Sequence, residues 1–264
     1  MQLVVDNLAK SFGVKTIFKN VSFMIDKGEK IGLVGVNGSG KSTLLHCLLQ
    51  NGYSDSGSVR FEAGTRVGYV EQGFGNIGSG SLWQFMMNSC PEIPEMRSRL
   101  QKLEAQAADL KPGEELDKVL DEYASVTRRY EYIDGYNYET RIKIVLNGLG
   151  FTEEVWDKPA QNFSGGQKTR ILLAAALVKS PDFLILDEPT NHLDIRMTEW
   201  LEKYLQDFKG GLLIVSHDRK FLDNVATRIL EMEGGQLQSF KGNYTKYMAQ
   251  KEIQTATLEA AYAA

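Results

Sequence analysis

A phosphate-binding loop constrains this chain more than any other feature of its sequence. Residues 35–42 have the spacing G-x-x-x-x-G-K-S, between an apolar run at 30–34 and a helix-like run at 43–49. Glycines in such a loop let backbone N–H groups turn toward phosphates, and the helix that follows presents the positive end of its dipole. Lys41 is placed to reach the β- and γ-phosphates, and Ser42 to ligate Mg²⁺. The pattern predicts strand, loop and helix in that order, and therefore an α/β fold that binds a nucleoside triphosphate.

Length and charge exclude several classes of protein. The 264 residues can bury a full core as one large α/β domain, or as one domain with an inserted subdomain. The 34 Asp and Glu against 30 Lys and Arg leave no overall positive field for nucleic acid or an anionic membrane. The longest apolar run, 171–178, is far too short for a bilayer, and no C-x-x-C pair is present. We expect a cytoplasmic protein with no membrane insertion.

The pattern of apolar residues changes twice along the chain. Short apolar stretches broken by glycine at 2–26 and 57–70 predict a small antiparallel sheet. After Pro94 the sequence turns to long helical stretches, and buried-strand patterns return at 183–186 and 212–215. A helical subdomain is therefore expected to interrupt an α/β core.

Two amphipathic helices, at 95–110 and 114–132, make up most of the expected insert. Each carries apolar residues at helical spacing, which are Met96, Leu100, Leu103 and Leu110 in the first and Leu116, Val119, Leu120 and Tyr123 in the second. The residues Lys111-Pro112-Gly113 between them predict an antiparallel hairpin. Because its charges are mixed, two interpretations stay open: a hairpin that packs only on its own domain, and an arm that projects toward a partner.

Three motifs in the second half complete the pattern. Residues 164–167, S-G-G-Q, open a predicted helix whose N-cap is Ser164 and whose accessible N–H groups form a second anion site. The strand at 183–186 ends in Asp187 and Glu188, which can hold Mg²⁺ and polarise an attacking water, and the strand at 212–215 is followed by His217. The order of these motifs points to an enzyme that hydrolyses its nucleotide.

In this order the motifs resemble the nucleotide-binding domain of the ATP-binding cassette (ABC) superfamily, over nearly the whole chain. The resemblance implies an ABC-type fold with a P-loop core, a small antiparallel β-subdomain and an inserted helical subdomain, an ATPase activity, and ATP and Mg²⁺ as cofactors. It implies catalytic roles for Glu188, His217 and Gln72, and metal contacts from Ser42, Gln72 and Asp187. The implied nucleotide contacts are Phe12, Gly35, Asn37, Gly38, Ser39, Gly40, Lys41, Ser42, Thr43, Ser164, Gly165, Gly166, Gln167 and Asp194.

Several of these residues have ordinary structural interpretations when each is taken alone. Phe12 could be a strand aromatic, Gln72 a loop amide and His217 a hydrogen-bonded turn residue. Their order and spacing around Lys41 and Asp187 favour the functional interpretation. For His192 we expect a structural part. One departure from the superfamily is Phe163, which stands where the signature motif more often has Leu.

Local strings resemble one branch of the superfamily, the ABC-F proteins, which carry two cassettes in one chain and act on ribosomes. The string at 187–194, D-E-P-T-N-H-L-D, has Asn191-His192 where membrane-transporter cassettes usually carry Ser-Ala or a similar pair. Further matches are S-H-D-R at 216–219, G-N-Y-T-K-Y at 242–247 and Y-N-Y-E at 136–139. The resemblance implies the ribosome, with its rRNA and tRNA, as a partner.

This chain has one phosphate loop and one signature motif, whereas the branch has two of each. We therefore expect the first cassette of a longer chain, and a natural single-cassette protein is the alternative. A second cassette, in the same chain or as a transient homodimer, is expected to complete the ATP site. The expected bounds are an ATP-binding α/β core at 1–92 and 159–242, a helical subdomain with a candidate arm hairpin at 93–158, and the start of an interdomain linker helix at 243–264.

Two other functions remain open. The catalytic residues are equally those of an ATPase subunit of a membrane ABC transporter, against which Asn191-His192 and the linker-like tail stand. A DNA-repair or chromosome-maintenance ATPase would carry a much longer coiled coil than this insert. Among ribosomal tasks, the sequence leaves regulation, rescue and antibiotic protection open.

Overall fold

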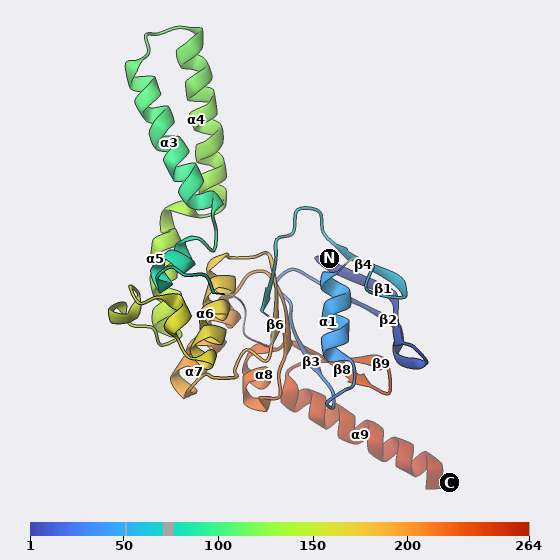
Figure 1. Cartoon of the computed structure of the whole chain (residues 1–264). Helices are drawn as coiled ribbons and strands as arrows, with labels where there is room; N and C mark the ends of the chain where they lie inside the picture. The colour runs from blue at the N-terminus through green and yellow to red at the C-terminus, as the bar shows by residue number, and fades with distance from the viewer. Residues whose placement is uncertain (51, 71–76, 264) are drawn as a thin grey trace. The chain divides into compact units, whose positions relative to one another are not determined.

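The chain folds into two compact units. The computed structural model describes residues 1–50, 52–70 and 77–263, and Figure 1 shows the course of the chain. Unit 1 consists of residues 1–73 and 180–264, and unit 2 of residues 74–179. Unit 2 is larger at both ends than the expected helical subdomain at 93–158. It includes helices α2 (Leu82–Met87) and α6 (Gly165–Val178), because both contact helix α5 (Tyr138–Gly148).

A six-stranded sheet forms the centre of unit 1, in the order β5-β6-β7-β3-β8-β9. The first five strands are parallel, and β9 pairs with β8 in the antiparallel sense. Their bounds are β3 Lys30–Val34, β5 Val67–Val70, β6 Phe183–Asp187, β7 Gly211–Val215, β8 Arg228–Glu233 and β9 Gln236–Lys241. Every residue of β6 and β7 is buried, as expected for continuous apolar strands in a parallel sheet covered on both faces.

A three-stranded antiparallel sheet, β2-β1-β4, confirms the expected small β-subdomain. Its strands are β1 Leu3–Phe12, β2 Lys15–Ile25 and β4 Ser56–Phe61. In β1 the side chains of Leu3, Val5 and Leu8 are buried and join one core with residues of β3, β6 and helix α1 (Lys41–Leu49). Three further helices of unit 1 are α7 Ile195–Asp207, α8 Arg219–Val225 and α9 Tyr244–Ala263.

One strand lies in a different sheet from the one we predicted. The stretch at 66–70 was expected in the antiparallel sheet, but β5 pairs in parallel with β6. The backbone carbonyl of Arg66 accepts hydrogen bonds from the N–H groups of Asp182 (2.8 Å) and Phe183 (3.1 Å). A Cβ at Gly68 would lie 2.8 Å from Cγ of Pro181. This close approach explains why residue 68 is a glycine. The parallel pairing also gives hydrogen-bond partners to backbone groups whose partners the local sequence does not reveal.

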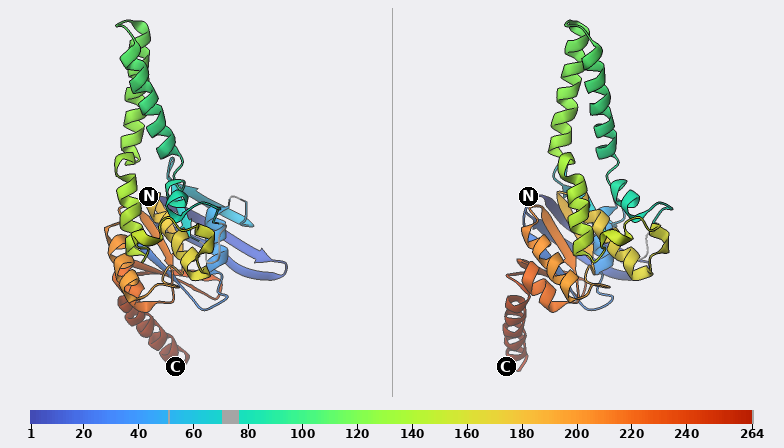
Figure 2. Two further views of the ribbon diagram at one scale, coloured as in Figure 1. Left: turned by 60° about the vertical axis from the view of Figure 1, so that its left-hand side comes forward. Right: turned by 90° about the vertical axis from the view of Figure 1, so that its left-hand side faces the viewer.

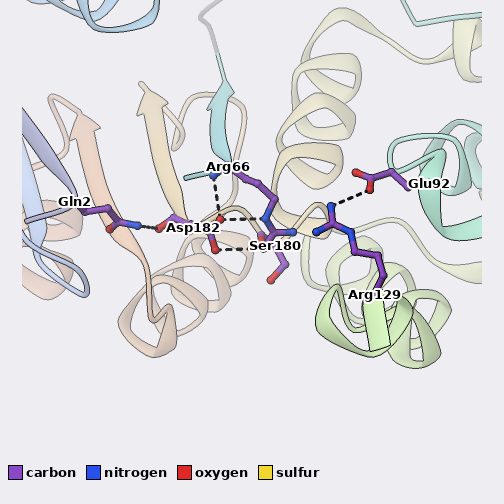
Figure 3. A network of polar contacts seen from close by, with 6 residues as sticks. All are labelled: Gln2, Arg66, Glu92, Arg129, Ser180 and Asp182. Atoms are coloured by element: carbon purple, nitrogen blue, oxygen red, sulfur yellow. Dashed lines mark hydrogen bonds and ion pairs between the residues drawn. The ribbon is translucent and has the colours of Figure 1, made fainter. Parts of the chain in front are cut away.

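Polar side chains tie the start of the parallel strands to β1 (Figure 3). Nε2 of Gln2, which is 2% exposed, donates to the carbonyl oxygen of Asp182 at 2.6 Å, and Oε1 of Gln2 accepts from the N–H of Gly211 at 2.8 Å. Oδ2 of Asp182 accepts from both the backbone N–H and Nε of Arg66, each at 3.0 Å. The network therefore fixes the first residues of β1, β5, β6 and β7 to one another.

Unit 2 is helical, and its longest helices form the expected hairpin. They are α3 Glu92–Asp109 and α4 Glu114–Tyr132, and within unit 2 this hairpin extends away from α5 and α6 (Figure 2). Helix α3 begins before Pro94, because a proline in the first turn loses no helical hydrogen bond. Leu100 and Leu103 are buried as predicted, whereas Leu120 is 47% exposed.

The base of the hairpin is held by ion pairs and hydrogen bonds within unit 2. Arg97 donates from Nε to the hydroxyl of Tyr130 at 3.1 Å and from Nη1 to Glu139 at 2.7 Å, so it joins α3, α4 and α5. Arg129 of α4 pairs with Glu92 of α3 at 3.4 Å (Figure 3). Among the described residues of unit 2, short 3₁₀ turns also lie at Gly135–Asn137, Glu153–Val155 and Ala160–Asn162. No helix in the described part of the chain has the length and apolar character needed to cross a bilayer.

Candidate functional site

The phosphate loop connects strand β3 to helix α1, and close backbone approaches define its shape. A Cβ at Gly35 would lie 2.4 Å from the carbonyl oxygen of Met232, and one at Gly40 would lie 2.6 Å from Cγ2 of Ile17. Because Cβ atoms do not come so close to other atoms, only glycine fits at these two positions. Gly40 also has φ of 107° and directly precedes the first turn of α1. The loop is thus packed against β8 and β2.

Lys41, the first residue of α1, lies inside the loop. It is 9% exposed, and its Nζ donates to the carbonyl oxygens of Gly35 at 2.7 Å and Val36 at 3.2 Å. Burial lowers the pKa of its ammonium group, while the charges of Glu188 and Asp187 act to raise it. The ammonium is therefore held by neutral carbonyls, and an anionic oxygen would be a stronger partner for it.

A cavity of about 540 Å³ within unit 1 brings most of the predicted residues of this unit together. Its volume is in the range of about 300–1,000 Å³ that is typical of small-molecule sites. The predicted residues that line it are Asn37, Gly38, Gly40, Lys41, Ser42, Thr43, Asp187, Glu188 and His217. The same space is thus bordered by the phosphate loop and by the two acids and the histidine that follow β6 and β7.

The two acids and the histidine meet because β6 and β7 are neighbouring parallel strands. Asp187, the last residue of β6, pairs in register with Val215 and is 8% exposed. Oε2 of Glu188 accepts from the backbone N–H of His217 at 3.2 Å, and Nε2 of His217 lies 3.5 Å from Oε1 of Glu188. Glu188 has φ of 51°, a left-handed conformation that is unfavourable for this residue type. Its carboxylate is thereby turned toward the cavity and toward His217.

The residues around the cavity fit a magnesium-bound triphosphate. The hydroxyl of Ser39 is buried with no hydrogen-bond partner in the described part of the chain. Ser42 and Asp187 line the same cavity and offer a hydroxyl and a carboxylate oxygen. Mg²⁺ in nucleotide sites is commonly held by one or two protein oxygens together with the substrate phosphates.

Four predicted nucleotide contacts of unit 1 are not among the residues that line this cavity, namely Phe12, Gly35, Ser39 and Asp194. Phe12, at the end of β1, is 50% exposed and has its ring edge-on to Tyr53, with 6.4 Å between the centroids. Asp194 is the N-cap of α7 and accepts from the N–H of Met197 at 2.9 Å. It borders a separate depression of about 250 Å³. In this structure Asp194 therefore acts as a helix cap.

The signature residues lie in unit 2, at the start of α6. Ser164 is the N-cap, and its hydroxyl accepts from the N–H of Gln167 at 3.3 Å while its own N–H donates to Oε1 of Gln167 at 2.9 Å. This reciprocal pair is a capping box, which the spacing S-x-x-Q encodes. Gly165 and Gly166 form the first turn. The remaining predicted residue, Gln72, lies outside the described residues.

Three residues that line the cavity were not predicted from the sequence. They are Ile17, Asn191 and Val215. Asn191 lies between Glu188 and Asp194 in the string at 187–194, and this position could have indicated that it lies near the site. Ile17 has no such signal, because an isoleucine in a strand is ordinarily a core residue, and only the packing of β2 beside Gly40 brings it to the cavity.

Comparison with known proteins gives matches over nearly the whole chain. A family model described as "ABC transporter" matches residues 18–191, and a second one with the same description matches residues 230–264. The chain is 34% identical over 260 residues to the uncharacterised ABC transporter ATP-binding protein YfmM of Bacillus subtilis, covering 98% of this chain and 50% of YfmM. It is 36% identical over 262 residues to ABC transporter F family member 5 of Arabidopsis thaliana, covering 97% and 37%.

A third relative is the tylosin resistance ATP-binding protein TlrC of Streptomyces fradiae, 36% identical over 250 residues, with 95% of this chain and 46% of TlrC covered. The chain thus spans half or less of the length of these curated relatives. Among solved structures, an ATP-binding subunit of an ABC transporter superposes with a TM-score of 0.71 at 18% identity, over 100% of this chain and 98% of the other. The protein cbiO1 of Clostridium perfringens gives a TM-score of 0.61 at 24% identity, with coverages of 95% and 92%. Both show the same fold.

Proposed function

Since the chain belongs to the ABC transporter family and is an ABC ATPase domain, we propose that it is the ATP-hydrolysing cassette of an ABC-F protein that acts on the ribosome. The observation that carries the ATPase part is the cavity in which Lys41 and Ser42 of the phosphate loop lie with Asp187, Glu188 and His217. The same residues would serve any ABC ATPase, so the ABC-F part rests on separate support.

Each residue of the cavity has a part in phosphoryl transfer to water. In this proposal the loop amides and Lys41 bind the β- and γ-phosphates, and Ser42 and Asp187 hold Mg²⁺. The bound metal supplies charge neutralisation for the transferred phosphoryl group. Glu188 accepts a proton from the attacking water, and His217, 3.5 Å from it, contacts the terminal phosphate. Gln72 is assigned to coupling metal occupancy to the helical unit.

The ABC-F assignment is supported by relatives and by local sequence. Members 5 and 2 of the Arabidopsis ABC transporter F family are 36% and 38% identical to this chain, and TlrC is a tylosin resistance protein by its description. Asn191, one of the two residues that distinguish the ABC-F string, lines the cavity. We propose a cytoplasmic protein whose partners are the ribosome and a second cassette. The proposed domain bounds remain 1–92 with 159–242, 93–158 and 243–264.

Co-sedimentation with ribosomes tests this proposal. Glu188→Gln, made in the full-length gene product, keeps the size and polarity of the side chain but removes its proton-accepting carboxylate. ATP should still bind, turnover should fall by roughly 10²-fold or more, and the variant should sediment with ribosomes when ATP is present. Exposed Glu115, changed to Gln, is the matched control and should behave as the parent.

The same experiment tests the second candidate, the ATPase subunit of a membrane transporter, which the description of the matching family favours. Recovery of Glu188→Gln with the membrane fraction, and its absence from ribosomes, would replace the ABC-F proposal. Hydrolysis at the parental rate would remove Glu188 from its catalytic role.

A further inference from the structure

A lysine lies over two aromatic rings at the exposed end of β1. Nζ of Lys10 is 5.3 Å from the centroid of the Phe12 ring and 4.6 Å from that of the Tyr53 ring. The two rings meet edge-on, at an interplanar angle of 67°. Cations within about 6 Å of a ring centroid are attracted by the negative face of the ring. The three side chains therefore form one cluster, which we call the Lys10 cluster.

The ammonium of this cluster is held by an ion pair, and most of the Lys10 side chain is shielded from water. The side chain of Lys10 is 14% exposed, and its Nζ donates to Oδ1 of Asp55 at 3.0 Å. The other oxygen of Asp55 accepts from the backbone N–H of Ser11 at 2.6 Å. The hydrogen bond from Lys10, followed by that from Ser11, lowers the pKa of Asp55. Asp55 thus holds both the lysine and the backbone just before Phe12.

Ring contacts connect the cluster to the helix that follows the phosphate loop. The ring of Tyr53 lies 5.8 Å from the imidazole of His46, centroid to centroid. Nδ1 of His46 is 2.7 Å from the carbonyl oxygen of Ser42, in the first turn of α1. Phe12 is therefore positioned relative to the phosphate loop through Tyr53, His46 and Ser42, all within unit 1.

Half of Phe12 is exposed, while Lys10 lies against its ring. A cation on a ring draws its π-electron density, and an electron-poor ring stacks more strongly on an electron-rich partner. Purine bases are large and electron-rich, and bases stack well on aromatic side chains. Nothing in the family match assigns a part to Lys10.

We propose that Lys10 is a specificity-determining residue that acts through Phe12 to strengthen stacking of the purine base of the bound nucleotide. The inference rests on the proposed ATP binding and on Phe12 as the base contact. Lys10 does not touch the nucleotide in this assignment: it acts on the ring of Phe12 as a positioning and polarising residue.

The first test separates binding of the base from binding of the phosphates. Lys10→Met keeps the length of the aliphatic stem but removes the charge, and Lys10→Arg keeps the charge. Calorimetric titration of the 264-residue chain with Mg-ATP should show a Kd that is about twofold to fivefold weaker for Lys10→Met. Lys10→Arg should restore the parental Kd. Magnesium tripolyphosphate, which has no base, should bind parent and variants equally.

A double-mutant cycle tests whether the effect passes through the ring. In a Phe12→Leu background, Lys10→Met should cause no further loss of ATP affinity. Lys19→Met, at an exposed position of β2 away from Phe12, is the control and should bind as the parent. Lys10→Gln gives a second charge-free variant if Lys10→Met is unstable by thermal melting.

The outcomes distinguish this inference from the proposed function. Parental ATP affinity in Lys10→Met, or equal losses for ATP and tripolyphosphate, would overturn the assignment of Lys10 while leaving the ATPase intact. An additive loss in the Phe12→Leu background would show that Lys10 acts elsewhere. Absence of ATP and tripolyphosphate binding by the parent chain would instead count against the proposed function itself.

Discussion

At the scale of single residues, the site depends on groups held in unusual environments. The ammonium of Lys41 is nearly buried and bonded to two carbonyl oxygens of the loop. Glu188 has a positive φ, and its Oε1 is buried without a hydrogen bond in the described part of the chain. Strained backbone conformations are concentrated at functional sites, and buried polar groups without a hydrogen bond are rare enough to call for an explanation.

Replacing Lys41 with Ala should weaken Mg-ATP binding because it removes a charge-assisted contact to phosphate. Such contacts contribute about 1.5–3 kcal/mol, which corresponds to roughly a tenfold to 150-fold increase in Kd. Calorimetric titration measures this change directly. Lys19→Ala, at an exposed position of β2, is the control. An unchanged Kd for Lys41→Ala would contradict the phosphate-loop assignment.

At the scale of elements, the first residues of the parallel strands are joined by ion pairing as well as by the backbone ladder. The guanidinium of Arg66, before β5, donates to both oxygens of Asp182, before β6. Hydrogen bonding by Arg66 holds the pKa of Asp182 below its ordinary value, although partial burial acts in the opposite direction. The pairing of β5 with β6 is therefore linked to pH.

Acid should reduce the stability that the Arg66–Asp182 pair contributes. The pKa of Asp182 is lower in the folded state than in the unfolded state, where it is about 3.9. The stabilising contribution of Asp182 is therefore complete above the unfolded-state pKa, and it is lost as the pH falls through the folded-state pKa. Asp182→Asn should lower the free energy of unfolding at pH 7 and should make it less dependent on pH below about 4. Urea unfolding from pH 2.5 to 7 measures both effects. Asp117→Asn, on exposed α4, should leave the pH profile unchanged; parallel profiles for parent and Asp182→Asn would refute the linkage.

At the scale of the whole molecule, the phosphate loop and the signature helix belong to different compact units. ABC cassettes work as dimers or as two-cassette chains. In the arrangement that we propose, the signature of one cassette faces the nucleotide of another. The capping box at Ser164 leaves the first N–H groups of α6 available for such an anion. A single chain then carries two half-sites.

ATP turnover per molecule by the 264-residue chain should therefore rise with protein concentration, because the population of transient homodimers follows mass action. Ser164→Arg should abolish the rise by blocking the facing phosphate site, with ATP affinity nearly unchanged. Specific ATPase activity across a wide dilution series measures this. A substantial rate that does not change on dilution would show that one cassette suffices.

Local patterns in the sequence determined the features whose cause is local. Glycine spacing and the following helix predicted the phosphate loop, and the spacing S-x-x-Q predicted the N-cap of α6, because both depend on contacts within a few residues. Two Pro-Gly-linked apolar stripes predicted α3 and α4. The apolar runs before Asp187 and His217 predicted β6 and β7, and the order of the motifs predicted the ABC family.

Only the tertiary structure decided which distant segments meet. It placed β5 beside β6 rather than in the antiparallel sheet, because the backbone groups of Arg66, Asp182 and Phe183 satisfy one another there. It brought Ile17 to the cavity through the packing of β2 beside Gly40, and Lys10 onto the ring of Phe12 through Asp55. Such contacts depend on pairing and packing between residues far apart in the chain. The spacing of apolar residues, with a period of two in strands and 3.6 in helices, shows which face of an element is buried. It does not show which other element will pack on that face or pair with that strand edge.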